Sequence, residues 1–155
     1  VGPVYLRFGR LAVPVINDRP DYKFEIGKGG LLREGTDLTI VATGLCVAGA
    51  LEAADKLAAE GVSAEVINIH TIKPLDKELI LNSARKTGKV VTAEEHSIIG
   101  GLGGAVCEAL SEEAPTKVLR IGVKDTFGES GPAAALLAKY QLDGAGIYAQ
   151  IKEWL

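Results

Sequence analysis

The sequence predicts an α/β fold, a three-layer α/β/α sandwich with a mainly parallel sheet of about five strands. Between residues 38 and 123, segments rich in β-branched residues alternate with segments in which apolar residues recur at helical spacing. This alternation is typical of βαβ units, in which helices cover both faces of a parallel sheet. The chain has 155 residues, 47% of them hydrophobic and 24% charged, which is enough for a domain with a sizeable core.

Each predicted element follows from a local pattern. Residues 23–35 contain a glycine turn, and we expect a hairpin or an edge element there. Asp76 is a suitable N-terminal cap, while Gly61 and Gly88 stand where helices should end. Runs of β-branched residues predict strands at 38–44, 64–69, 89–96 and 117–123. Helical spacing predicts helices at 46–61, 76–88, 101–114, 133–141 and 144–155.

The first residues are expected to lie outside this domain. The stretch GPVYLRFGR (2–10) has the composition of a short strand, and the prolines, asparagine and aspartates that follow it are typical of a linker. We therefore place a boundary near residue 20. Residues 1–22 would be the end of a preceding domain and its linker, and residues 23–155 the main domain. The chain begins at Val1 and contains no methionine, so we expect it to be part of a longer polypeptide.

The composition argues against several classes of protein. The chain has 17 Lys and Arg against 20 Asp and Glu, a net charge of −3, and no basic run. Neither nucleic acid nor an anionic membrane is therefore an expected partner. No segment is apolar over the length of a bilayer, and the first residues do not resemble a signal peptide. Cys46 and Cys107 are expected to be free thiols in a reducing cytoplasm.

The predicted topology brings polar residues to one edge of the sheet. Ligands of open α/β sheets usually bind at the carboxyl ends of the strands. His70 and His96 both follow predicted strands and should lie at this edge, together with Glu94. The same edge should contain Gly44, Thr71, Glu95, Lys124 and Asp125. A ligand or interface site at His70, Glu94 and His96 is therefore one hypothesis.

The stretch EEHSIIGGLGGAV (94–106) is compatible with several interpretations. Its glycines do not complete a Gly-x-Gly-x-x-Gly fingerprint and its acids would repel a phosphate, so nucleotide binding is disfavoured. A metal held by His70, His96 and a glutamate, and acid–base chemistry by Glu94 and His96 on one side of the strand, are minor alternatives. The favoured interpretation is a strand end and a tight glycine turn into a helix. Cys46, at a helix N-terminus, is interpreted as a buried apolar group rather than a reactive thiol.

Three motifs, taken in order, resemble one family. VINIHTIKPLD (66–76), EEHSIIGGLGGAV (94–106) and IGVKDTFGESG (121–131) are similar to the C-terminal domain of thiamine-diphosphate-dependent transketolases. The resemblance is greatest to the split type, which is made of two polypeptides. GPVYLRFGR (2–10) resembles the end of the preceding pyrimidine-binding domain. The tail at 142–155 is closer to 1-deoxyxylulose-5-phosphate synthase, which is the first alternative.

Two further alternatives remain. The β subunits of 2-oxo-acid dehydrogenase E1 components contain a similar domain. A regulatory module that binds a small ligand near His70 and His96 belongs to a different functional class.

The resemblance implies a role within a larger enzyme. The parent would transfer a two-carbon ketol unit between sugar phosphates in the pentose phosphate pathway, with thiamine diphosphate and Mg²⁺ as cofactors. The family's metal-binding Gly-Asp-Gly…Asn motif has no match here, and its activating glutamate would lie before Val1. This chain should then supply no catalytic, cofactor-binding or metal-binding residue and be inactive alone. It would be a structural and homodimerisation module that joins an N-terminal transketolase subunit or domain, with Trp154 and Leu155 as candidates for a buried contact.

One substrate contact is implied at Arg10. In the family, an arginine just after the Gly-Pro strand binds the phosphate of the sugar. Counted from Gly2 and Pro3, this arginine corresponds to Arg10, and Arg7 is the weaker candidate. The planar guanidinium suits the task because it pairs with two phosphate oxygens at once.

Overall fold

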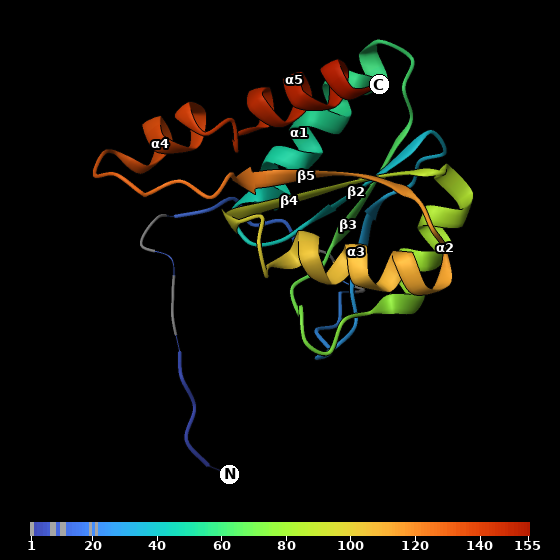
Figure 1. Ribbon diagram of the computed structural model, residues 1–155, viewed down its shortest axis with the longest axis horizontal. Coiled ribbons are helices and arrows are strands. Elements are labelled where there is room, and N and C mark those ends of the chain that lie inside the picture. The colour runs from blue at the N-terminus through green and yellow to red at the C-terminus, as the bar shows by residue number, and fades with distance from the viewer. Residues whose placement is uncertain (1, 7–8, 10–11, 19, 21) are drawn as a thin grey trace.

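The computed structural model describes residues 2–6, 9, 12–18, 20 and 22–155, and in these residues it contains a five-stranded sheet with helices on both faces (Figure 1). The strand order is β1-β3-β2-β4-β5. The strands are β1 (Gly30–Arg33), β2 (Leu38–Ala42), β3 (Ala64–Asn68), β4 (Lys89–Ser97) and β5 (Lys117–Val123). The helices are α1 (Cys46–Ala59), α2 (Lys77–Thr87), α3 (Leu102–Glu113), α4 (Ala133–Lys139) and α5 (Gly144–Trp154).

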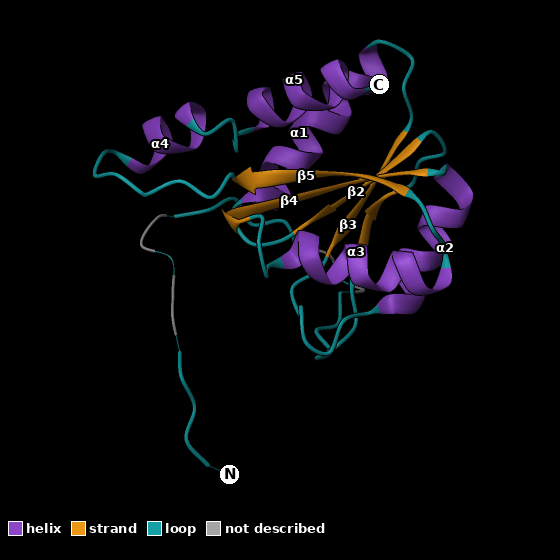
Figure 2. Cartoon of the chain, viewed as in Figure 1, coloured by secondary structure: helices purple, strands orange, loops and turns teal. Residues whose placement is uncertain are grey.

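The sheet is parallel except at one edge. Strands β3, β2, β4 and β5 run parallel to their neighbours, whereas β1 pairs antiparallel with β3. The predicted edge element at 23–35 is thus confirmed as the short strand β1. The helices form a layer on each side of the strands (Figure 2). The predicted three-layer α/β/α sandwich is therefore confirmed, with every helix and strand expected after residue 37.

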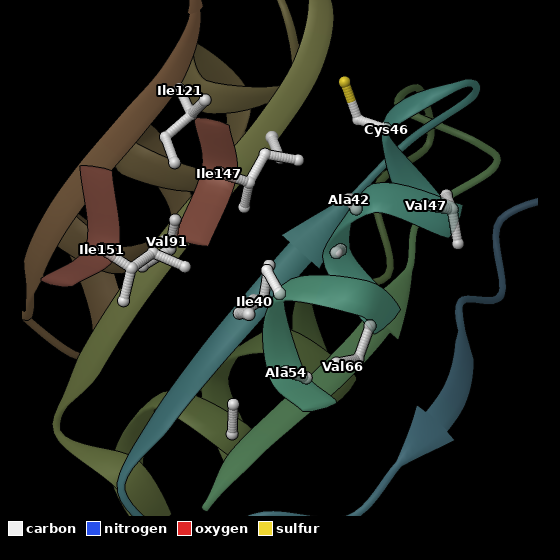
Figure 3. Close-up of a cluster of buried hydrophobic side chains, with 14 of the residues drawn as sticks. Ile40, Ala42, Cys46, Val47, Ala54, Val66, Val91, Ile121, Ile147 and Ile151 are labelled. Atoms are coloured by element: carbon white, nitrogen blue, oxygen red, sulfur yellow. The ribbon is translucent and has the colours of Figure 1, made fainter. Parts of the chain in front are cut away.

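A separate apolar core lies on each face of the sheet. On one face, α1 and α5 cover Ile40, Val66 and Val91, and Ile147 and Ile151 of α5 are fully buried there (Figure 3). On the other face, α2 and α3 cover the strand residues Val41, Ile67 and Val90. This division follows from the strand period of two, which sends successive side chains to opposite faces. Burial of each such side chain contributes roughly 1.5–3 kcal/mol.

The ends of α2 are fixed by local chemistry that the sequence makes visible. The Asp76 carboxylate accepts a hydrogen bond from the backbone N–H of Leu79 at 3.3 Å, as an N-terminal cap should. Its other oxygen accepts from Gly29 N–H at 2.9 Å and ties the chain before β1 to the same point. Gly88 ends the helix with a left-handed φ of 69°. Both predicted helix ends are confirmed. Among the described residues, no helix combines the length and the apolar character needed to cross a membrane.

A buried carboxylate near the amino end of β3 anchors α2 to the sheet. Glu65 is only 3% exposed, and one of its oxygens accepts a hydrogen bond from Ser83 Oγ at 2.5 Å. The other oxygen forms an ion pair with Lys86. Burial by itself raises the pKa of Glu65, but Lys86 and Ser83 outweigh it and the pKa is lowered from its ordinary value. Ser83 also bonds to Thr39 of β2 at 2.5 Å, so the network joins two strands and one helix.

The N-terminal segment differs from the prediction. No strand is formed at the described residues 2–6 or 9, and Val4, Tyr5 and Leu6 are exposed. The segment extends away from the sheet (Figure 1). A strand predicted at 2–10 has no neighbouring strand in this chain to bond its backbone amides, so it does not form. Further along the segment, Ile16 packs against the α1 side of the core.

Candidate functional site

The carboxyl ends of the parallel strands meet at one edge of the sheet. The registers of β2 with β3 and β4, and of β4 with β5, align these ends. The helix α4, none of whose residues is buried, lies beyond this edge (Figure 1). Of the residues expected at the edge, Gly44, His70 and Lys124 follow β2, β3 and β5 respectively. The edge is therefore the place where each candidate side chain can be examined.

The strand β4 contains a bulge at its carboxyl end. Ala93 pairs with Ile121 and Ser97 pairs with Val123, so three residues of β4, at 94–96, lie opposite the single residue Gly122. A Cβ atom on Gly122 would lie 2.8 Å from the carbonyl oxygen of His96, which is too close for any larger residue. The bulge interrupts the regular alternation of side chains. The expectation that Glu94 and His96 share one side of a regular strand therefore does not apply here.

Glu94 is the structural centre of this edge. Its side chain is completely buried, and its two oxygens accept hydrogen bonds from the backbone N–H groups of Leu102 and Gly103, each at 2.8 Å. These are orphan donors of the first turn of α3, so the carboxylate caps the helix and compensates its dipole. A Cβ atom on Gly101 would overlap this carboxylate. The glycine-rich turn therefore admits a buried glutamate.

This arrangement narrows the interpretations of the 94–106 stretch. The place at the N-terminus of α3 where a phosphate would bind holds the Glu94 carboxylate. Both oxygens of Glu94 are engaged by backbone donors, whereas His96 is exposed, so the two do not form an acid–base pair. The favoured interpretation, a strand end and a glycine turn into a core helix, is confirmed.

His70 occupies a different part of the edge. It is half-buried, its Nδ1 lies 2.9 Å from Thr71 Oγ1, and its ring lies 4.7 Å from that of Phe24. Because β2 lies between β3 and β4, His70 and His96 follow strands that are about 10 Å apart. Within the described part of the chain, no three His, Cys, Asp or Glu side chains are grouped so that they could hold a metal ion.

A cavity beside His70 was not foreseen from the sequence. It has a volume of about 530 Å³ and lies between the segment 13–17 and the turn from β2 into α1. Asn68 and Asn17 contribute polar groups to its wall. Only the position of Asn68 at a strand end could have indicated it, because nothing local shows that residues 13–17 fold back over the sheet.

The relatives of this chain identify its family. The transketolase C-terminal domain family matches residues 27–147. The chain belongs to this family. A 6-deoxy-6-sulfo-D-fructose transketolase subunit of Clostridium sp. is 52% identical to it over 91% of the chain and 44% of the relative. A putative transketolase C-terminal section of Methanocaldococcus jannaschii is 49% identical over 98% of the chain and 48% of the relative.

Solved structures agree with this family assignment. A split-gene transketolase described as an inactive β4 tetramer is 54% identical, with a TM-score of 0.85 over 91% of this chain and 46% of that chain. The transketolase of Campylobacter jejuni shares the fold, with a TM-score of 0.63 at 18% identity over 88% of this chain and 20% of that chain. A 1-deoxy-D-xylulose-5-phosphate synthase of Geobacter sulfurreducens is 45% identical over 99% of the chain and 25% of the relative. This transketolase C-terminal domain thus spans less than half the length of these relatives.

The two cysteines of the transketolase C-terminal domain are not poised as nucleophiles. Cys46 is fully buried, and burial, followed by the charges of Glu95 and Glu94, raises its pKa to about 12. Burial also raises the pKa of Cys107. Both therefore remain protonated thiols at neutral pH, and the interpretation of Cys46 as a buried apolar group is confirmed. Arg10 and Arg7, the candidates for a phosphate contact, lie outside the described residues.

Proposed function

We propose that this transketolase C-terminal domain is the structural and dimerisation module of a split transketolase that transfers a two-carbon ketol unit between sugar phosphates. The family match over residues 27–147 carries the proposal. The 52% identity to a transketolase subunit and the 54% identity to a split-gene transketolase support the two-polypeptide form. In this role the chain alone is inactive, and the parent enzyme acts in the pentose phosphate pathway.

Thiamine diphosphate and Mg²⁺ belong to the rest of the parent enzyme in this proposal. The glycine turn into α3 does not suit a diphosphate, because the buried Glu94 carboxylate already accepts from the N–H groups of Leu102 and Gly103. A second anion at this place would be repelled. The cofactor would supply the two-carbon transfer chemistry in the other half, and the residues described here would keep their structural tasks.

The first 22 residues form the end of a preceding pyrimidine-binding domain and its linker in this proposal, and residues 23–155 form the C-terminal domain. The start of the family match at residue 27 supports this division. Arg10 then contacts the phosphate of the sugar. Replacing Arg10 by Ala in the assembled enzyme should raise the KM for phosphorylated sugars, and an unchanged KM would contradict the assignment.

The proposed partners are an N-terminal transketolase subunit and a second copy of this domain. The carboxyl edge offers apolar surface for such contacts, since Phe127 is fully exposed and Ile99 is 63% exposed. Leu155 at the end of the chain is also partly exposed, at 45%. The free thiols Cys46 and Cys107 support a reducing compartment, and we place the enzyme in the cytoplasm.

The test is reconstitution. The chain with its natural flanking sequence would be purified alone and together with the N-terminal subunit, and transfer of a two-carbon unit from a ketose phosphate to an aldose phosphate would be measured. Activity only in the mixture, with a dimer or larger assembly by light scattering, is the expected result. Activity of the chain alone, or none in the mixture, would contradict the proposal.

The second candidate is the corresponding domain of a 1-deoxyxylulose-5-phosphate synthase. The 45% identity to the Geobacter sulfurreducens synthase over 99% of the chain favours it. The same reconstituted mixture distinguishes the two, because only a synthase forms 1-deoxy-D-xylulose 5-phosphate.

A further inference from the structure

The cavity beside His70 has the size and position of a small-molecule site. Its volume is about 530 Å³, within the range of ligand pockets. It opens at the carboxyl ends of β2 and β3, where Gly44 and Leu45 lead into α1. Open α/β sheets usually bind ligands at such a strand edge. Residues 13–17 form the opposite wall and contribute apolar surface.

Asn68 places a buried amide against this cavity. It is the last residue of β3 and only 5% exposed. Val66 belongs to the core under α1 and Ile67 to the core under α2 and α3, so the alternation turns Asn68 toward α1 and the cavity. Among the described residues, no hydrogen bond is formed by its side chain. A buried amide without a partner is costly, which points to a ligand that bonds to it.

The N-terminus of α1 opens into the same cavity. Its N-cap residue Leu45 makes no side-chain hydrogen bond, and its first turn contains no acidic residue. The other long helices differ, because carboxylates of Asp76, Glu94 and Asp143 accept from the first turns of α2, α3 and α5. Leu45, Val47 and Ala48 line the cavity at this end. The positive end of α1 is thus left for an external anionic group.

Two further polar groups define the remaining contacts. Nδ1 of His70 is engaged by Thr71 Oγ1, so Nε2 is the ring nitrogen left for a ligand. Asn17 Oδ1 is buried and, within the described residues, has no hydrogen-bond donor. It therefore selects a ligand that carries a donor such as a hydroxyl. Glu94 and Glu95 act electrostatically on Cys46 at the same end of α1, which favours a monoanion over a dianion.

We propose that this cavity binds a small hydroxy-monocarboxylate. Its carboxylate accepts from the Asn68 amide, His70 Nε2 and the N-terminus of α1, and its hydroxyl donates to Asn17 Oδ1. The apolar surfaces of Val15 and Val47 pack against its carbon atoms. This site stands apart from the proposed two-carbon transfer, so its failure would leave the proposed function untouched.

The proposal is tested by titrating the full chain with lactate and following backbone and side-chain amide resonances. Lactate should shift the Asn68 side-chain and Ala48 amide resonances saturably, and acetate, which lacks the hydroxyl, should bind more weakly. Inorganic phosphate at matched ionic strength should bind more weakly still. Absence of a saturable shift with lactate, or equal binding of all three anions, would overturn the proposal.

Matched variants locate the binding. Asn68→Asp replaces the donor amide by a repelling carboxylate and should weaken lactate binding by about tenfold or more. Asn82→Asp makes the same change on the exposed face of α2 and should leave binding unchanged. Should Asn68→Asp unfold, Val15→Trp provides the test, because Val15 is 82% exposed and its enlargement fills the cavity without disturbing the core. Equal weakening by both Asn variants, or normal binding by the Val15 variant, would refute the site.

Discussion

Two glutamates are buried in this sheet at opposite ends, and different groups stabilise their charge. Glu65, near the amino end of β3, is held by the side chains of Lys86 and Ser83. Glu94, at the carboxyl end of β4, is held by backbone N–H groups of Leu102 and Gly103. The first arrangement is a contact between side chains that fastens a helix already formed. The second is part of the turn itself, because the carboxylate determines where α3 begins.

The difference teaches which buried charge the fold depends on more strongly. The Lys86 side chain is 40% exposed, so water and salt weaken its pair with Glu65. The donors to Glu94 are buried and cannot turn to water if the carboxylate is lost. We therefore expect the carboxyl end of the sheet to tolerate substitution less well than the amino end.

The largest effect is expected from Glu94→Ala. The substitution leaves the N–H groups of Leu102 and Gly103 without an acceptor and creates a cavity, which should lower the free energy of unfolding by about 3–5 kcal/mol. Urea denaturation measures the loss. The neighbouring exposed residue provides the control, since Glu95→Ala should stay within about 0.5 kcal/mol of the parent. Similar values for the two variants would mean that Glu94 does not organise the turn.

The next effect is expected from Lys86→Met. It leaves Glu65 buried without its cation and should cost about 2–3 kcal/mol, less than for a fully buried pair because Lys86 is partly exposed. Adding Glu65→Gln to Lys86→Met should recover part of the loss in the same denaturation experiment. Lys77→Met, which removes exposed pairs with Glu112 and Glu113, should change stability by less than about 0.5 kcal/mol. A Lys86 variant as stable as the Lys77 variant would remove the distinction.

A matched pair of glycine substitutions separates the turn from the helix. Gly101→Ala brings a Cβ atom into the Glu94 carboxylate and should cost about 2 kcal/mol. Gly104→Ala, inside α3, meets no atom within 4 Å and should stabilise the protein by about 0.5–1 kcal/mol. Thermal or urea denaturation would show the opposite signs. Equal effects would show that the glycines serve only chain flexibility.

The smallest expected effect is a pH dependence at the amino end. The pKa of Glu65 is lowered from an ordinary value of 4.5, so the charged form adds stability above that value. This contribution is lost as the pH falls through the lowered pKa. The difference in unfolding free energy between the parent and Glu65→Gln should therefore be constant near neutral pH and shrink in acid. A difference that grows in acid would mean that the pKa is raised.

Much of the fold could be predicted because its determinants are local. The Asp76 cap and the Gly88 stop act within one or two turns of their own helix, and both were visible in the sequence. The bulge at 94–96 was not predictable, because it depends on Gly122, which lies on another strand. Residues 2–6 have strand composition but no partner strand, and composition alone cannot reveal that.

The candidate site was predictable only in outline. The sheet edge and the presence of His70, Glu94 and His96 there follow from the order of the elements. Their separation does not, since the order of strands places β2 between β3 and β4. Asn17 was interpreted as a linker residue, and only the path of the chain brings it to the cavity wall.

The bulge opposite Gly122 has a consequence for how such sequences vary. Glu94, Gly101 and Gly122 belong to two different motifs, yet each is fixed by the same small volume, because the glutamate needs both glycines to fit. A change at one position should therefore be inherited with a change at another. Statistically, the three positions count as a single constraint, and methods that treat them as independent will overstate how much they say about catalysis.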